Sequence, residues 1–184
     1  MTINPIEIIN EFYKPGSKAH GIILHHGEDV ATKAIAVAKR VTHLHPDLAF
    51  IEESALLHDI AIWMTDSPEI GCHGAHPYVV HGYLGRIILE EKGFPLHAMV
   101  CERHVGVGLT VDMIKANYLP LPLRDMVPVT IEEQIICYAD KFFSKKSKSG
   151  TKEKPIEEVI SEISRYGSDQ VARFMSMAKL FGAL

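Results

Sequence analysis

The sequence has little of several features that define special classes of protein. Only three cysteines occur in 184 residues, Cys72, Cys101 and Cys137, and no two form a Cys-x-x-Cys pair. A scattered, odd-numbered set builds no disulfide framework and is typical of a reducing compartment. No apolar run approaches the roughly 18 residues of a membrane span, and the first residues lack the basic and apolar regions of a signal peptide. We therefore expect a cytoplasmic protein that does not enter a membrane.

The chain also lacks a large excess of charge of either sign. Its formal net charge is −4, and no basic stretch is long enough to follow a nucleic-acid backbone, so binding to duplex nucleic acid is not expected. The exception is a group of lysines over residues 145–154. We interpret this segment as an exposed, mobile loop, with a flap that grips a substrate phosphate as the alternative.

The spacing of apolar residues predicts helices along almost the whole chain. Residues 22–41 carry an apolar face with a 3.6-residue period, and Thr130-Ile131-Glu132-Glu133 has the sequence of a capping box. No alternation convincingly predicts a strand. The sequence therefore predicts an all-α bundle in one domain, with helices over residues 6–13, 17–41, 49–63, 77–92, 95–104 and 130–140, two more starting at 155 and 168, and a loop over 65–76.

The adjacent pair His58-Asp59 is the most informative feature present. It lies within residues 49–63, an almost wholly apolar stretch of good helix formers, where both side chains would be buried. A buried charge is tolerated when it is paired or bound to metal, and neutral imidazole is the commonest metal ligand. Adjacent side chains on a helix point about 100° apart. One metal therefore suits only one of the two, whereas two metals would let Asp59 bridge them.

Four further polar residues lie in or at the end of separate apolar runs: His26, His81, His104 and Asp140. Their order with the pair is His, His-Asp, His, His, Asp. Together with His-x-x-x-Val-Ala-x-x-Ala at 26–34 and Gly106-Val107-Gly108-Leu109, this order resembles the HD-domain metal-dependent phosphohydrolase superfamily over roughly residues 20–145. The remaining histidines do not fit the pattern, and we assign His43, His45 and His97 to the surface.

The resemblance implies that residues 1–184 form a single HD domain, an all-α HD-domain-like bundle with its metal-binding core at about 20–145 and C-terminal helices over 155–183. It also implies the ligands: His26, His58, Asp59 and Asp140 for one metal, and His81, His104 and bridging Asp59 for a second. Histidines with carboxylates suit Fe or Mn best, with Zn, Co and Ni as further candidates. Two such ions lie about 3.5–4 Å apart and activate a water as the nucleophile of a phosphoryl transfer.

The implied function is a hydrolase that cleaves a phosphate ester or anhydride of a nucleotide or another small phosphorylated metabolite. Asp59 and Lys141 are the candidate catalytic residues. A substrate phosphate needs cationic donors, and the candidates beside the ligands are Arg86, Arg103 and Lys141.

The chain departs from the superfamily pattern after the His-Asp pair. Many members have His-Asp-x-Gly-Lys, whereas this sequence has His58-Asp59-Ile60-Ala61-Ile62, so the lysine that assists phosphate chemistry in those relatives is missing. The Gly-Tyr-Pro signature of the cyclic-di-GMP branch is also absent. Two alternatives stay open, because fold and ligands do not fix chemistry: an HD-type diiron oxygenase and a non-catalytic sensing module that contains metal. The sequence also leaves the oligomeric state open.

Overall fold

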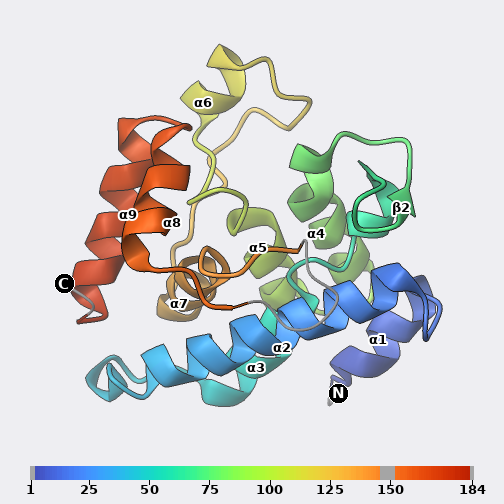
Figure 1. Ribbon diagram of the computed structural model, residues 1–184, viewed down its shortest axis with the longest axis horizontal. Coiled ribbons are helices and arrows are strands. Elements are labelled where there is room, and N and C mark those ends of the chain that lie inside the picture. Colours follow the sequence, from blue (N-terminus) through green and yellow to red (C-terminus); the bar gives the residue numbers. More distant parts are fainter. Residues whose placement is uncertain (1–2, 146–151, 183–184) are drawn as a thin grey trace.

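The computed structural model describes residues 3–145 and 152–182, and most of this chain is helical (Figure 1). This confirms the all-α prediction. The α-helices are α1 (Pro5–Phe12), α2 (Lys18–Ala38), α3 (Leu48–Leu57), α4 (His81–Glu91), α5 (Pro95–Arg103), α6 (Val111–Ala116), α7 (Ile131–Asp140), α8 (Ile156–Ser164) and α9 (Ser168–Leu180). Three single 3₁₀ turns, η1 (Thr42–Leu44), η2 (Ile62–Met64) and η3 (Tyr78–Val80), lie in the connections.

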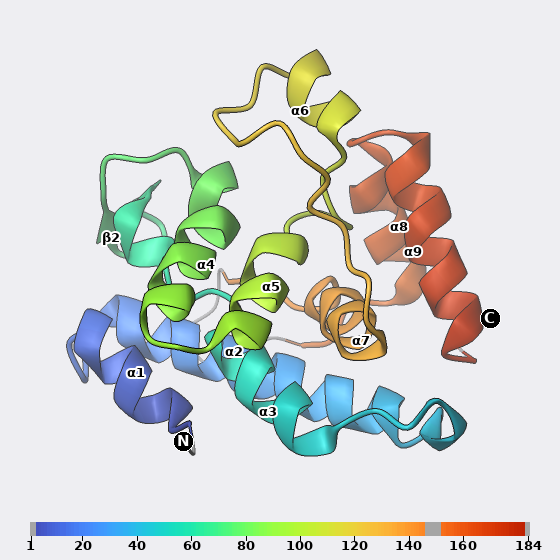
Figure 2. The ribbon, with the colours of Figure 1, turned by 180° about the vertical axis from the view of Figure 1, so that it is seen from behind.

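The longest helix, α2, runs along one edge of the molecule beside α3, and α4 and α5 form a second helix pair (Figures 1 and 2). Helix α7 packs against α2, α3 and α5, while α8 and α9 pack together on its far side. The bundle interior therefore lies among α2, α3, α5 and α7. Nearly every residue of α7 from Ile135 to Asp140 is buried, which brings the end of this helix to the centre of the protein.

Side-chain caps fix where the main helices begin. Ser17 accepts a hydrogen bond from the backbone of His20 at the start of α2, and Asp47 accepts one from Phe50 at the start of α3. The predicted capping box is present at α7, where Thr130 and Glu133 each accept from the other's backbone. Such caps satisfy amide groups that the first turn of a helix leaves unpaired.

The structure corrects the predicted helix over residues 49–63. Helix α3 ends at Leu57, and the chain continues in tight turns in which Ile60 N–H donates to Leu57 and Ile62 N–H donates to Asp59. The His58-Asp59 pair thus lies just after a helix rather than at its middle. The apolar pattern could not show this, because residues 60–62 are as buried in the turns as they would be in a helix.

Two smaller expectations also need correction. The loop at 65–76 contains a short antiparallel hairpin, β1 (Asp66–Ser67) and β2 (Cys72–His73), with Ser67 paired to Cys72. His97 is buried rather than at the surface, with Nε2 at 3.1 Å from Glu53 of α3.

Small residues bring α4 and α5 close together. A Cβ atom added to Gly82 would lie 2.5 Å from the backbone oxygen of Cys101, closer than real Cβ contacts. Only glycine therefore permits this spacing without a backbone shift. The close approach places His81, at the start of α4, opposite His104, just after α5. Within residues 3–145 and 152–182, no helix combines the length and apolar character needed to span a membrane.

Candidate metal centre

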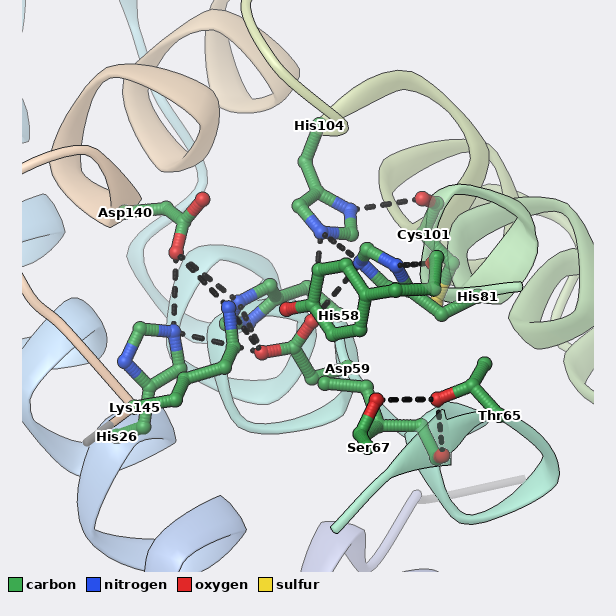
Figure 3. A network of polar contacts seen from close by, with 12 residues as sticks. His26, His58, Asp59, Thr65, Ser67, His81, Cys101, His104, Asp140 and Lys145 are labelled. Atoms are coloured by element: carbon green, nitrogen blue, oxygen red, sulfur yellow. Dashed lines mark hydrogen bonds and ion pairs between the residues drawn. The ribbon is translucent and has the colours of Figure 1, made fainter. Parts of the chain in front are cut away.

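Six polar side chains from five parts of the chain converge at the centre of the bundle (Figure 3). Each is buried, with at most 6% of its surface exposed. The structure therefore brings together all six predicted ligands, which we call the His/Asp cluster: His26 of α2, His58 and Asp59 after α3, His81 of α4, His104 after α5 and Asp140 at the end of α7.

The two carboxylate oxygens of Asp59 face different pairs of histidines. Oδ2 lies 3.4 Å from His26 Nε2 and 3.2 Å from His58 Nε2. Oδ1 lies 3.3 Å from His81 Nε2 and 3.4 Å from His104 Nε2. One carboxylate therefore joins two groups of potential ligands.

Asp140 completes the first of these groups. Its Oδ1 lies 2.9 Å from His26 Nε2 and 3.5 Å from His58 Nε2. The first group thus consists of His26, His58, Asp140 Oδ1 and Asp59 Oδ2, and the second of His81, His104 and Asp59 Oδ1. This division matches the two ligand sets that the sequence resemblance implies.

The turn after α3 is held in place from α1. The hydroxyl of Tyr13 donates to the backbone oxygen of Asp59 at 3.3 Å and accepts from the backbone of Trp63 at 3.1 Å. Because the chain leaves the helix at Leu57, these contacts help to hold the backbone that carries the Asp59 carboxylate. Tyr13 lies outside the predicted metal-binding core, and its amphipathic helix gave no sign of this role.

Three of the histidines are oriented by backbone carbonyls three residues earlier. The Nδ1 atoms of His58, His81 and His104 lie 2.6, 2.6 and 2.7 Å from the oxygens of Ala55, Tyr78 and Cys101, respectively. A carbonyl oxygen only accepts, so each Nδ1 carries the proton. In the neutral ring Nε2 then has a free lone pair directed into the cluster, the arrangement usual for metal-binding histidines.

The cluster consequently contains acceptors that face acceptors. The Nε2 atoms of His81 and His104 are 3.1 Å apart, and in the neutral rings two lone pairs would oppose each other there. Asp59 Oδ1 and His58 Nε2 are buried without a hydrogen-bond partner among the described residues. Buried acceptors of this kind are unfavourable unless a cation lies between them.

The spacing of these atoms fits transition-metal coordination. Ligands about 2.1 Å from a metal lie about 3.0 Å apart at octahedral angles and about 3.4 Å apart at tetrahedral angles. The distances from histidine nitrogens to carboxylate oxygens in the first group, 2.9 to 3.5 Å, and the three separations in the second, 3.1 to 3.4 Å, cover the same range. Imidazole nitrogen and carboxylate oxygen are ligands for Fe, Mn, Zn and Co. The residues present therefore fit a divalent metal.

The pKa values of three histidines in the cluster are shifted in different directions. Burial lowers the pKa of His58, but Asp59 and Asp140 outweigh burial and raise it to about 9. Burial and the nearby charge of Lys145 lower the pKa of His26 to about 4, and burial lowers that of His104 to about 3. Burial opposes ionisation of Asp59, yet His58 and Lys145 hold its pKa well below the usual range. The cluster thus contains two carboxylates that attract positive charge.

A lysine outside the prediction enters the cluster. Lys145 Nζ forms an ion pair with Asp59 Oδ2 at 2.8 Å and lies 3.8 Å from Asp140 Oδ1, with 15% of its side chain exposed. We interpreted residues 145–154 as an exposed loop, and this interpretation is wrong for Lys145, the first residue of the segment. Residues 146–151 lie outside the described chain. A lysine in a polar segment gives no sequence signal for burial, and only its position five residues after Asp140 could have suggested it.

The other predicted phosphate-binding cations have different surroundings. Lys141 Nζ donates to Asp140 Oδ2 at 2.6 Å and to the His104 carbonyl at 3.0 Å. These contacts turn Asp140 so that its other oxygen faces the histidines.

The two predicted arginines contact carboxylates outside the cluster. Arg86 donates to Glu90 and Glu102, and Arg103 donates to both oxygens of Glu133 at 2.8 and 2.9 Å. No ion pair among the described residues joins Arg86 or Arg103 to the His/Asp cluster, and their role in binding phosphate remains a prediction.

The buried cysteines next to the cluster behave as thiols. Cys101 Sγ donates to the Leu57 carbonyl at 3.4 Å, and Cys137 Sγ donates to the His104 carbonyl at 3.6 Å. Burial raises the pKa of both, that of Cys137 to about 11. Since the thiolate is the metal-binding form, these cysteines pack as small apolar residues.

Comparison with known proteins gives relatives but no matching family model. The chain is 33% identical over 132 residues to the uncharacterized protein MJ0778 of Methanocaldococcus jannaschii, which covers 71% of this chain and 68% of that protein. Two proteins named tRNA (cytidine(56)-2'-O)-methyltransferase also match, at 27% identity in Thermoplasma volcanium and 34% in Picrophilus torridus. The aligned regions cover 87% and 68% of this chain but only 41% and 33% of those proteins.

Solved structures share the whole fold. The HD domain of the phosphodiesterase PgpH from L. monocytogenes, in complex with cyclic-di-AMP, aligns with a TM-score of 0.52 at 17% identity, covering 99% of this chain and 96% of that domain. A second structure of that domain gives a TM-score of 0.52 at 15% identity. At this identity the likeness establishes the architecture. The chain thus has the HD-domain fold and belongs to the family of the uncharacterized protein MJ0778.

Proposed function

We propose that this chain is a metal-dependent phosphohydrolase that cleaves a phosphate ester or anhydride of a small phosphorylated metabolite. The observation that supports the proposal most strongly is the position of Asp59, with one carboxylate oxygen toward His26 and His58 and the other toward His81 and His104. A carboxylate placed in this way suits two ions that it bridges. Two divalent ions held there would lower the pKa of a water and neutralise charge on a phosphoryl group.

The residues of the chain have distinct roles in this proposal. Three of the four histidines, His58, His81 and His104, have Nδ1 held by a backbone carbonyl, which keeps the rings from turning and directs Nε2 into the cluster, where it could bind a metal. Lys141 orients Asp140. The walls of the cluster exclude bulk water, because its six members are almost wholly buried. Electrostatic stabilisation of a phosphoryl transition state is stronger in such an enclosed site.

The charges of the cluster favour an anionic substrate. Two carboxylates, Asp59 and Asp140, are accompanied by two ammonium groups, Lys141 and Lys145. Two divalent ions would leave this region strongly positive, and a phosphate would compensate that charge. The PgpH structure with cyclic-di-AMP is a case in which an HD domain binds a phosphate-containing ligand.

Methyl transfer is not part of the proposal. The two relatives with a methyltransferase name are much longer than the region that this chain matches. A buried cluster of histidine and aspartate has no direct use in moving a methyl group, whereas it fits metal-assisted hydrolysis.

A panel of phosphate esters and anhydrides tests the proposal. Protein loaded with Mn²⁺ in air, or with Fe²⁺ under anaerobic conditions, should release phosphate from at least one class of substrate, and His104→Gln should abolish the release. Absence of phosphate release with every metal, or oxygen consumption coupled to iron oxidation on a non-phosphorylated substrate, would contradict a hydrolase and favour an oxygenase.

A further inference from the structure

A small cavity lies beside two residues that contact the His/Asp cluster. It has a volume of about 240 Å³ and is lined by Glu69, Ile70, Tyr78, Ser144 and Lys145. Two of these residues also contact the cluster: Lys145 pairs with Asp59, and the ring of Tyr78 lies 4.5 Å from the ring of His81 between centroids. The side chain of Lys145 therefore connects the wall of the cavity with Asp59, the carboxylate that the proposed metals would share.

From this arrangement we infer that the cavity is the substrate pocket, that Lys145 and Tyr78 bind the phosphate, and that Glu69 binds the organic part of a small phosphomonoester. The inference rests on the proposed function. It names Tyr78 and Glu69, which the sequence did not assign, and Lys145, which the sequence placed only within a segment whose alternative role was to grip phosphate. It also supplies the missing element of the pattern, because the lysine absent after His58-Asp59 would be replaced by one that follows Asp140.

The ammonium group of Lys145 lies among anionic groups. It is largely buried, and its anionic partners are Asp59 at 2.8 Å and Asp140 at 3.8 Å. A buried ammonium needs an anion close by. With both carboxylates committed to metals, a phosphate in the cavity would be the anion that remains within reach of this side chain.

Tyr78 also supports the inference, because it lines the cavity and its hydroxyl shares a hydrogen bond with Lys145. A phenol hydroxyl can donate to a phosphate oxygen as well as accept from an ammonium group. The two side chains thus place donors at one end of the cavity, next to the cluster.

The size of the cavity and the acidic residue in its lining limit the substrate. Its volume lies below the 300 Å³ or so that marks the lower end of common ligand pockets, which favours a small monoester over a dinucleotide. Glu69 is exposed at the cavity and carries a carboxylate. A carboxylate accepts hydrogen bonds from hydroxyl or amino groups and repels a second phosphate. Phosphates of sugars or other polyols fit these constraints.

Binding of inorganic phosphate to Mn²⁺-loaded protein tests the phosphate end without relying on turnover. By calorimetry, Lys145→Met should weaken phosphate binding at least tenfold, Lys145→Arg should retain most of it, and Lys152→Met, at an exposed lysine farther along the same connection, should change it less than twofold. Manganese content should not fall in any of these variants. Unchanged phosphate affinity in Lys145→Met, or loss of manganese from it, would overturn the assignment.

Kinetics with two kinds of substrate test the role of Glu69. Glu69→Gln should raise KM several-fold for glycerol phosphate and ribose 5-phosphate without lowering kcat, and should leave p-nitrophenyl phosphate, which has no hydroxyl donor, unaffected. Equal KM values in the variant and the parent would remove Glu69 from the pocket. If the protein binds phosphate through Lys145 but hydrolyses no substrate, the pocket assignment stands and the proposed hydrolase function is refuted. The failure of the pocket assignment and the failure of the proposed function can therefore be distinguished.

Discussion

Replacement of Asp59 by asparagine tests the proposed bridging role of this residue. The amide keeps the shape of the side chain but offers only one ligating oxygen, so one group of histidines would face an NH₂ donor instead of a ligand. The distances of 3.2 to 3.4 Å place one carboxylate oxygen at each group. Loss of the shared negative charge should therefore weaken metal binding about 100-fold or more at each group, or about 2.8 kcal/mol.

The same variant should also lose some stability, because Lys145 loses its nearest anion. Breaking a buried ion pair by removing one partner costs about 3–5 kcal/mol, and each kcal/mol lowers Tm by roughly 2–4 °C for a protein of this size. The double variant Asp59→Asn/Lys145→Met removes the unpaired ammonium and should recover most of the lost Tm without recovering metal. Asp66→Asn, at an exposed position of β1, is the matched control.

The assays are metal analysis after desalting, and circular dichroism with thermal denaturation. We expect Asp59→Asn to retain its helical spectrum, to lose nearly all metal and to be inactive. His81→Gln should be milder, since it affects only the second group. Normal metal content in Asp59→Asn would refute the bridging role, and loss of helical content at 20 °C in a parent that binds no metal would make Asp59 a structural residue.

Three further predictions concern other parts of the structure. Lys141→Ala should lower turnover at least tenfold with metal content within a factor of two, because its ammonium orients a ligand carboxylate; an unchanged rate would remove it from the mechanism. Gly82→Ala should lower Tm by several degrees, because the added Cβ meets the Cys101 backbone oxygen at 2.5 Å, whereas Gly21→Ala, with open space around it, should not lower Tm. Burial lowers the pKa of His97 in the folded protein, so as pH falls the unfolded chain takes up a proton on this histidine before the folded protein does. Tm should therefore decrease below about pH 6.5, and the decrease should be smaller in His97→Gln. Equal pH profiles of Tm in the variant and the parent would contradict this prediction.

The helical architecture follows from local sequence, and the structure confirms it where local signals are strong. The cap at Thr130 begins α7 at the expected residue because its side-chain oxygen pairs with an amide of the first turn of that helix. The end of α3 at Leu57 was not predictable from local sequence, and the turn that follows it is hydrogen-bonded to Tyr13, which lies 46 residues before Asp59. Apolar periodicity does not distinguish a buried helix from buried turns.

The six members of the His/Asp cluster were identifiable as a set because each is a polar residue in an apolar run and because their order resembles that of the HD-domain superfamily. The structure brings them together, and their binding of metal remains a prediction. Lys145 could not be identified in this way, because lysine in a polar segment usually remains in water. Its burial comes from the path of the chain after α7, which carries it back to Asp59. Likewise, the pairing of Arg86 with Glu102 and of Arg103 with Glu133 could not be predicted, because it depends on how α4, α5 and α7 pack together.

Anomalous diffraction from crystals of Mn²⁺- or Fe²⁺-loaded protein would locate any metal at the His/Asp cluster and so test whether Asp59 joins two metal sites. We expect two peaks about 3.5–4 Å apart, one among His26, His58, Asp140 and Asp59 Oδ2, and the other among His81, His104 and Asp59 Oδ1. No peak at the His/Asp cluster, together with no metal uptake in solution, would contradict this expectation.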